Sequence, residues 1–318
     1  MAAPSATLTA HTAIGNREDL SDIIFDISPM DTPFMSNVSR DSASAVLHAW
    51  QTHSLTAAAE NRVIEGDDAT TDAATLTSRF NNYCQISDKV ARVSGTQRSV
   101  TSAGRADEMS FQIAARGREL KRDIEVTLCG TQVATAGGLA SARATAGLAG
   151  WLFTNQVKLG TAATTPAITS GAPVTAPTAG TAAAFTSDHL NSAIALCWEQ
   201  GGNPTLILMD AANKRAASSF TGIATLYRDT PAAAPATIIG AADVFVSDFG
   251  THSLVASRFV PSDVVYCLDL EFWCVSYLRP IQQRELSKTG DSDRTQILAE
   301  YCLTAKHPDA SGKIYSTT

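Results

Sequence analysis

The stretch from Arg105 to Cys129 reads RADEMSFQIAARGRELKRDIEVTLC and gives the clearest helical signal in the chain. Apolar residues recur in it at steps of three and four residues and their multiples, so they share one face of an α-helix. These residues are Met109, Ile113, Leu120, Ile124 and Leu128. Gly130 follows where helices commonly end. A helix of this length spans roughly 37 Å, so a long helix is predicted to run through this part of the fold.

Two strands joined by a long polar loop precede this helix. Side chains alternate between the two faces of each strand. One face of the outgoing strand carries Val46, His48, Trp50 and Thr52, and one face of the return strand carries Phe80, Asn82, Cys84 and Ile86. The loop between them, residues 57–76, is too poor in apolar residues to build a core of its own. Loops of this kind are usually functional or disordered.

Residues 1–44 are predicted to form an extended arm. Leu20, Ile23 and Ile24 fall at helical spacing, and this short helix should end before Pro29 because the residue preceding a proline is pushed out of the helical region. Apolar residues then continue on an irregular segment to Phe34 and Met35. Such an arm either straps its own domain or lies on a neighbour. We favour the second reading and expect a neighbouring subunit to bury Ile23, Ile24, Phe34 and Met35.

The C-terminal half mixes helices and strands. Residues 131–184 are rich in Ala, Thr and Gly and are predicted to be mainly loops. A helix capped by Thr186 and its neighbours, a short buried strand at 205–209 and a helix starting at Asp210 follow. The rest, from residue 243 onward, is mostly strand. Helices packed on a small sheet account for this order, so the predicted class is α+β in two lobes.

Composition excludes several classes of protein. The 318 residues carry a net charge of -7, whereas nucleic-acid binders normally have a basic surplus. Charged residues make up only 17% of the chain, which suits a surface that is largely buried against neighbours. The six cysteines form no CxxC pair and have no histidine at zinc spacing. We expect no signal peptide and no membrane span, because no suitable apolar run is present.

The sequence predicts no catalytic residue, no cofactor site and no metal site. Ser292 follows Gly290 and Asp291 but lacks the Gly-x-Ser-x-Gly setting of a hydrolase nucleophile, so we expect an exposed surface turn there. None of the six histidines lies in a recognised catalytic setting. The basic residues Arg116 and Arg118 are interleaved with acids, which is typical of a solvated helix face.

Two local stretches resemble a known group of proteins. Residues 15–35 read GNREDLSDIIFDISPMDTPFM, and residues 277–280 and 285–292 read YLRP and ELSKTGDS. Both resemble signatures of a group of phage major head proteins. The order of arm, long hairpin, long helix, mixed lobe and strand-rich return is similar to the Hong Kong 97-type capsid fold. The signatures near both ends imply that the resemblance covers nearly the whole chain.

This resemblance implies a set of structural parts. Residues 1–44 would be the N-terminal arm and residues 45–96 the E-loop hairpin. Residues 97–134 would carry the spine helix of a peripheral domain. Residues 135–280 would form the axial domain, and residues 281–318 would return to the peripheral domain. The arm signature begins close to Met1, so we expect no built-in scaffolding segment.

The resemblance also implies a function. We expect a structural subunit, not an enzyme, that self-assembles into hexamers and pentamers of an icosahedral phage head around double-stranded DNA, with an encapsulin-like shell protein as the alternative. Implied partners are the portal protein, scaffold or decoration proteins, and packaged DNA in weak non-specific contact, with assembly in the bacterial host cytoplasm and no membrane. Intersubunit contacts are expected at the E-loop tip and on the spine helix. These residues are Glu60, Arg62, Glu65, Asp67 and Asp68 at the tip, and Arg116 and Arg118 on the helix.

Overall fold

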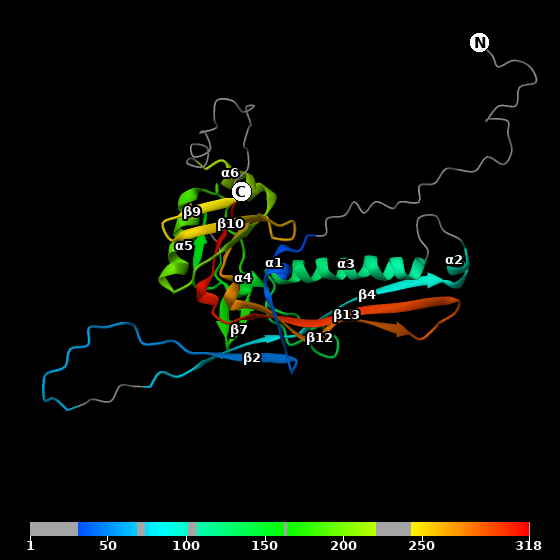
Figure 1. Ribbon diagram of the computed structural model, residues 1–318, viewed down its shortest axis with the longest axis horizontal. Coiled ribbons are helices and arrows are strands. Elements are labelled where there is room, and N and C mark those ends of the chain that lie inside the picture. Colours follow the sequence, from blue (N-terminus) through cyan, green and yellow to red (C-terminus); the bar gives the residue numbers. More distant parts are fainter. Residues whose placement is uncertain (1–30, 69–73, 101–106, 162–163, 221–242, 318) are drawn as a thin grey trace, which may run out of the picture.

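A computed structural model describes residues 31–68, 74–100, 107–161, 164–220 and 243–317. Figure 1 shows a rounded lobe, an elongated part in which a long helix lies beside long strands, and a loop that projects in the opposite direction. In the order of the chain, the helices are α1 (Pro33–Asn37), α2 (Gly95–Ser99), α3 (Glu108–Cys129), α4 (Leu148–Trp151), α5 (Ser187–Glu199) and α6 (Ala211–Ser218), with short 3-10 turns at Leu270–Phe272 and Pro308–Ala310.

The long helix is α3, and the periodicity predicted its buried face. Asp107 caps its first turn, because the side-chain carboxylate accepts hydrogen bonds from the backbone N–H groups of Met109 and Ser110. The side chains of Met109, Leu120, Ile124 and Leu128 are buried, and Ile113 packs partly buried beside them. Glu125 is also buried on this helix. Gly130 ends the helix, as expected, and its backbone is extended.

A four-stranded sheet lies along α3, with the order β1-β12-β13-β4. Its strands are β1 (Ser39–Ser42), β4 (Gln85–Ser94), β12 (Trp273–Leu286) and β13 (Ser292–Ala305). Strands β12 and β13 form a long antiparallel hairpin, and β4 pairs with β13 from Ser292↔Ser94 to Tyr301↔Gln85. Strand β1 runs parallel to the start of β12. The ion pair between Lys89 of β4 and Asp123 of α3, at 2.7 Å, links the helix to the sheet edge.

A six-stranded sheet forms the rounded lobe, with the order β5-β14-β11-β8-β10-β9. Its strands are β5 (Gln156–Lys158), β8 (Leu206–Met209), β9 (Val244–Ser247), β10 (Gly250–Ala256), β11 (Val264–Leu268) and β14 (Gly312–Tyr315). Successive side chains of β8 point to opposite faces of the sheet and join different hydrophobic cores. Ile207 and Met209 pack with the helix α5, whereas Leu208 joins the core that contains α3. The sheet therefore connects two hydrophobic clusters.

The predicted hairpin is present and is fixed at its base. Strands β2 (Leu47–Thr52) and β3 (Ser78–Tyr83) pair antiparallel, with Trp50 opposite Phe80. The Trp50 ring lies 5.3 Å from the buried Trp151 ring, and its Nε1–H donates to the carbonyl of Ala305 at 2.8 Å. A small hairpin, β6 (Ala167–Thr169) and β7 (Ala172–Thr175), lies against this base and was not expected in a segment predicted to be loops. The two predicted strands therefore anchor the E-loop to the core.

Three expected boundaries differ from the observed sheets. The return strand of the hairpin ends at Tyr83, and Ile86 already belongs to β4 of the four-stranded sheet. Strand β12 enters that sheet at Trp273, before the boundary expected at residue 280. Strand β14 pairs with β11 and β5, so residues 312–315 lie in the six-stranded sheet and not with the peripheral strands. All three boundaries are set by pairing between segments that are distant in the sequence, and local sequence patterns do not encode such pairing.

No helix in the described part of the chain is long and apolar enough to cross a membrane.

Lys313 on β14 is a buried cation. Its Nζ donates to the carbonyl of Ala149 in α4 at 2.7 Å and lies 5.0 Å from the centre of the Tyr315 ring. Burial, and to a smaller extent the charge of Lys158, lowers the pKa of Lys313 to about 7. In an unfolded chain the pKa of a lysine side chain is about 10.4. Between these two values the unfolded chain binds a proton that the folded chain has released.

We therefore expect the free energy of unfolding to rise with pH above about 7, by up to about 1.4 kcal/mol per pH unit from this one group. Lys313→Met should flatten this rise, which urea unfolding at pH 7 to 9.5 would measure. Lys121→Met, at an exposed position of α3, is the control and should keep the wild-type slope. An unchanged slope in Lys313→Met would contradict the assignment.

Candidate assembly surfaces

The arm enters the described structure through α1, which packs on α3. Pro33 begins α1 at a position where a missing N–H costs nothing. The next two backbone N–H groups, of Phe34 and Met35, each donate to a different oxygen of the Glu125 carboxylate at 2.8 Å. These bonds join residues about ninety positions apart in the sequence. The Glu125 side chain thus serves as the cap of a helix from another part of the chain.

The expectation that a neighbour buries Phe34 and Met35 is wrong. Both side chains are buried in the core of their own chain, in the cluster that contains Leu120 and Ile124 of α3. The reason is that α1 forms a helical turn, which directs both side chains onto α3. This segment therefore packs as a strap over its own domain, which was the alternative interpretation of the arm. Ile23 and Ile24 lie outside the described residues.

The buried position of Glu125 affects its charge. Removal from water raises the pKa of the Glu125 carboxyl, and the two hydrogen bonds from Met35 and Phe34 oppose that rise. Within the part of the chain that the structure describes, Glu125 forms no ion pair, so the two backbone N–H groups are the main compensation for burying its carboxylate. The contact therefore depends on the arm remaining in place.

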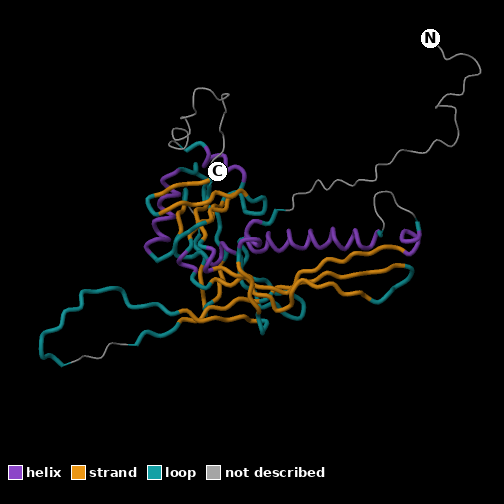
Figure 2. Tube along the Cα trace, viewed as in Figure 1, coloured by secondary structure: helices purple, strands orange, loops and turns teal. Residues whose placement is uncertain are grey.

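The E-loop tip, residues 53–68 and 74–77, contains no strand and projects beyond the body (Figures 1 and 2). Glu60 and Arg62 pair with each other, and Glu65, Asp67 and Asp68 are exposed. Gly66, at a φ of +87°, makes the tight turn between these acids. The structure thus brings the predicted tip residues together on one exposed loop.

The same loop exposes large apolar side chains that the sequence reasoning overlooked. The exposed fractions are 85% for Leu55, 72% for Val63, 78% for Ile64 and 88% for Leu76. Four such side chains on one unsupported loop make it a candidate binding surface, whereas single exposed apolar residues are ordinary. Two adjacent β-branched residues, Val63 and Ile64, between charged neighbours were the available signal.

The spine-helix arginines lie elsewhere. Arg116 of α3 already forms an ion pair with Glu119 one turn away, at 2.6 Å. Arg118 is exposed on the same helix. Figure 1 shows α3 and the E-loop extending to opposite ends of the molecule. One chain therefore does not bring the acidic tip and these arginines together.

The C-terminal signature residues serve packing and turns, as expected. Arg279 donates through Nε to Glu300 at 2.7 Å, and Arg143 contacts the other oxygen of the same carboxylate at 2.7 Å. Gly290 adopts a φ of +77° in the turn between β12 and β13. Lys288 in that turn pairs with Asp293 at 2.6 Å. These contacts fix the long hairpin.

The expected exposed turn at Ser292 is wrong. Ser292 is the first residue of β13 and only 7% exposed, because β4 covers it and Arg92 donates to its hydroxyl at 3.1 Å.

Another serine, Ser247, lies with its hydroxyl oxygen 2.7 Å from Nε2 of His252, whose second nitrogen contacts the backbone carbonyl of Pro204. His252 is buried in the β9–β10 hairpin, so this contact holds the hairpin turn. Within the described ranges no group of three or more His, Cys, Asp or Glu side chains could hold a metal ion.

Comparison with known proteins shows the family of the chain. The sequence matches the family described as SU10 major capsid protein over residues 6–318. The chain belongs to this family. The major capsid protein of Escherichia phage Phieco32 is 24% identical to it over 340 residues, covering 95% of this chain and 94% of that protein. As a major capsid protein, the chain is a structural subunit of a phage head.

Solved structures with the same fold include a cyanophage A-1(L) capsid chain. Its TM-score to this major capsid protein is 0.71 at 12% identity, with 98% of each chain covered. A chain of an encapsulin complex from Synechococcus elongatus gives a TM-score of 0.55 at 12% identity, covering 95% of this chain and 92% of that chain. These likenesses confirm the predicted α+β Hong Kong 97-type capsid fold.

Glu125→Ala should destabilise the capsid subunit strongly. It leaves two buried backbone N–H groups without an acceptor, at about 1–3 kcal/mol each, so we expect a loss of about 2–6 kcal/mol in the free energy of unfolding. Glu119→Ala on the same helix breaks a half-exposed pair and should cost at most about 1 kcal/mol. Chemical denaturation of both variants measures the difference. Equal losses would show that the arm contact contributes little.

Proposed function

We propose that this major capsid protein builds its shell from rings of five and six copies, in which the E-loop of one copy lies on the next. The observation that carries the proposal is the projecting loop with Leu55, Val63, Ile64 and Leu76 exposed. Burying one such side chain contributes about 1.5–3 kcal/mol. Only a partner can supply that burial, and a closed ring gives every loop the same partner surface.

The acidic tip residues provide a second, weaker contribution. Glu65, Asp67 and Asp68 are proposed to face cationic groups of the adjacent copy, with Arg116 and Arg118 as one candidate set. Exposed ion pairs contribute only about 0–1 kcal/mol each. Within this proposal the acids therefore select orientation and partner, and the apolar side chains supply most of the free energy of association.

Further partners follow from the same role. We propose a portal protein at one vertex, scaffold or decoration proteins, and packaged DNA as weak non-specific contacts. The net charge of -7 supports weak contact with DNA, because an acidic wall does not hold the genome tightly. The six cysteines are buried free thiols, which supports assembly in the reducing cytoplasm of a bacterial host. The proposal assigns no catalytic step to the chain.

An encapsulin-like compartment is the second candidate, since an encapsulin chain shares the fold. The family match over residues 6–318 favours the phage head. Electron microscopy and mass measurement of the assembled protein separate the two candidates. A head-sized icosahedral shell supports the proposal, and a small protein-filled compartment contradicts it.

Replacement of residues 54–76 by a short Gly-Asn turn should abolish assembly but not folding. The paired strands β2 and β3 and the Trp50 anchor remain, so the core is untouched. We expect a monomeric or small oligomeric species by light scattering, with wild-type circular dichroism. The control Ser170→Asn in the β6–β7 turn keeps Gly171 and should leave assembly unchanged. Full shells from the loop-deleted protein would overturn the proposal.

A further inference from the structure

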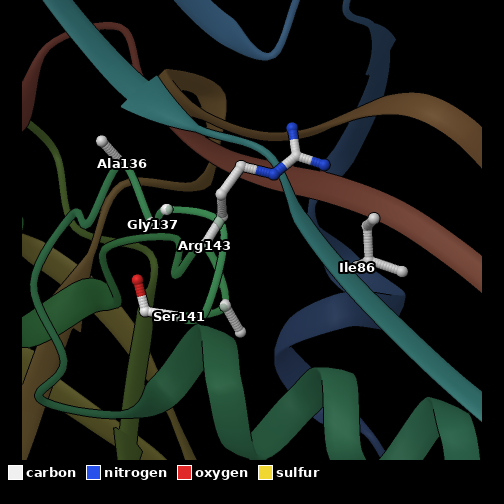
Figure 3. Close-up of a pocket in the computed structure, with 7 residues that line it drawn as sticks. Ile86, Ala136, Gly137, Ser141 and Arg143 are labelled. Atoms are coloured by element: carbon white, nitrogen blue, oxygen red, sulfur yellow. The ribbon is translucent and has the colours of Figure 1, made fainter.

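The segment from Thr135 to Ala144 forms a small closed loop on the body. Thr135 and Ala144 exchange backbone hydrogen bonds of 2.9 and 3.1 Å, and Gly138 donates to the carbonyl of Ser141 at 2.9 Å. Together with Ile86 of β4, this loop lines an open cavity of about 320 Å³ (Figure 3). The cavity lies in the Ala-, Thr- and Gly-rich part of the chain, to which the fold alone gives no role.

Gly137 fixes the shape of this loop. Its φ is +70°, a conformation that side chains rarely adopt. A Cβ atom at Gly137 would lie 2.9 Å from Cγ of Arg143 and 2.9 Å from the carbonyl oxygen of Ser141. Any larger residue would therefore push Arg143 away. The backbone conformation at Gly137 therefore determines the shape of the cavity.

One side of the cavity carries a surplus positive charge. Arg143 lines it and contacts Glu300, and Arg279 contacts the same carboxylate, each at 2.7 Å. The Glu300 side chain is 5% exposed, so two guanidinium groups share one buried carboxylate. Figure 3 shows the Arg143 side chain leaving the loop toward the strand that carries Ile86. Ile86 lies opposite Glu300 in the β4–β13 register and is exposed, so an apolar wall adjoins the cation.

We propose that this cavity receives the Val63–Ile64 segment of the E-loop of a second copy of the chain, an inference that rests on the proposed shell function. The segment offers two exposed aliphatic side chains, followed directly by the acids Glu65 and Asp67. The cavity offers aliphatic and alanine surface beside the uncompensated arginine charge. On both surfaces apolar groups therefore lie next to charged groups, and the charges on the two surfaces are opposite in sign.

The donor of the segment is another copy because of geometry. The E-loop leaves its own body at Thr52, and the eleven positions to Val63 extend at most about 36–40 Å when fully stretched. Figure 1 shows the loop projecting away from the body. The cavity lies on the body beside β4, and no described residue of the E-loop tip lines it, so the segment that we propose to fill it comes from an adjacent copy.

Disulfide trapping tests the contact in the full chain. All six native cysteines are buried, so two new surface thiols react selectively. The test variant combines Ile64→Cys with Ala142→Cys in the cavity loop, and mild oxidation of its shells should join the subunits. A disulfide forms only when the two Cα atoms come within about 7 Å. The matched control combines Ile64→Cys with Ala114→Cys, another exposed alanine, one turn before Arg118 on α3.

We expect loss of the monomer band and a ladder of covalent multimers on non-reducing gels for the test pair, and monomer for the control. Shells in which the control pair forms the ladder, or in which neither pair does, overturn the cavity assignment and leave the shell function intact. A monomer band that migrates faster than the reduced protein indicates a bond within one chain and also overturns it. If the test pair blocks assembly, a side-chain-resolution reconstruction of wild-type shells must place Ile64 against Arg143, and any other position refutes the proposal. Absence of shells from the wild-type chain defeats the proposed function itself.

Discussion

The structure depends on how the last part of β13 satisfies its backbone hydrogen bonds. β4 stops pairing at Tyr301, which leaves the following residues of β13 without a strand on that side. Side chains take its place. Asn82 donates to the carbonyl of Leu303 at 2.7 Å, the Leu303 N–H donates to the Thr145 hydroxyl at 3.2 Å, and Trp50 donates to Ala305. Buried backbone groups must be paired, so these contacts fix the E-loop base and the residue 145 region together.

This arrangement separates what the subunit buries by itself from what it leaves for others. The hairpin base is held by Trp50, Asn82 and the core around Trp151, whereas the tip beyond Thr52 has no strand and exposes its apolar side chains. A firmly held base limits the conformational entropy that the tip loses when it binds. A projecting loop of this kind is unfavourable for a monomer but well suited to a surface that repeats around a shell.

Glu125 applies the same principle inside the subunit. A buried carboxylate is costly unless it is hydrogen-bonded, and the two N–H groups at the start of α1 meet that need. The arm is therefore fixed where it reaches α3, which sets the point from which its preceding residues leave the body. Glu300 shows a second solution, in which two arginines from different segments share one carboxylate. That solution leaves positive charge at the surface, next to the cavity.

The sequence by itself determined the features that depend on neighbouring residues. The period of the apolar residues predicted α3, the alternation predicted β2 and β3, and the capping residues predicted α5. The end signatures predicted the fold and the family. Only the tertiary structure decided which surfaces are free. It buried Phe34 and Met35 on α3, covered Ser292 with β4, returned β14 to the six-stranded sheet and joined Arg143 to Glu300. The physical reason is separation along the chain, because these contacts join segments tens to hundreds of residues apart, and local propensity carries no information about such pairings.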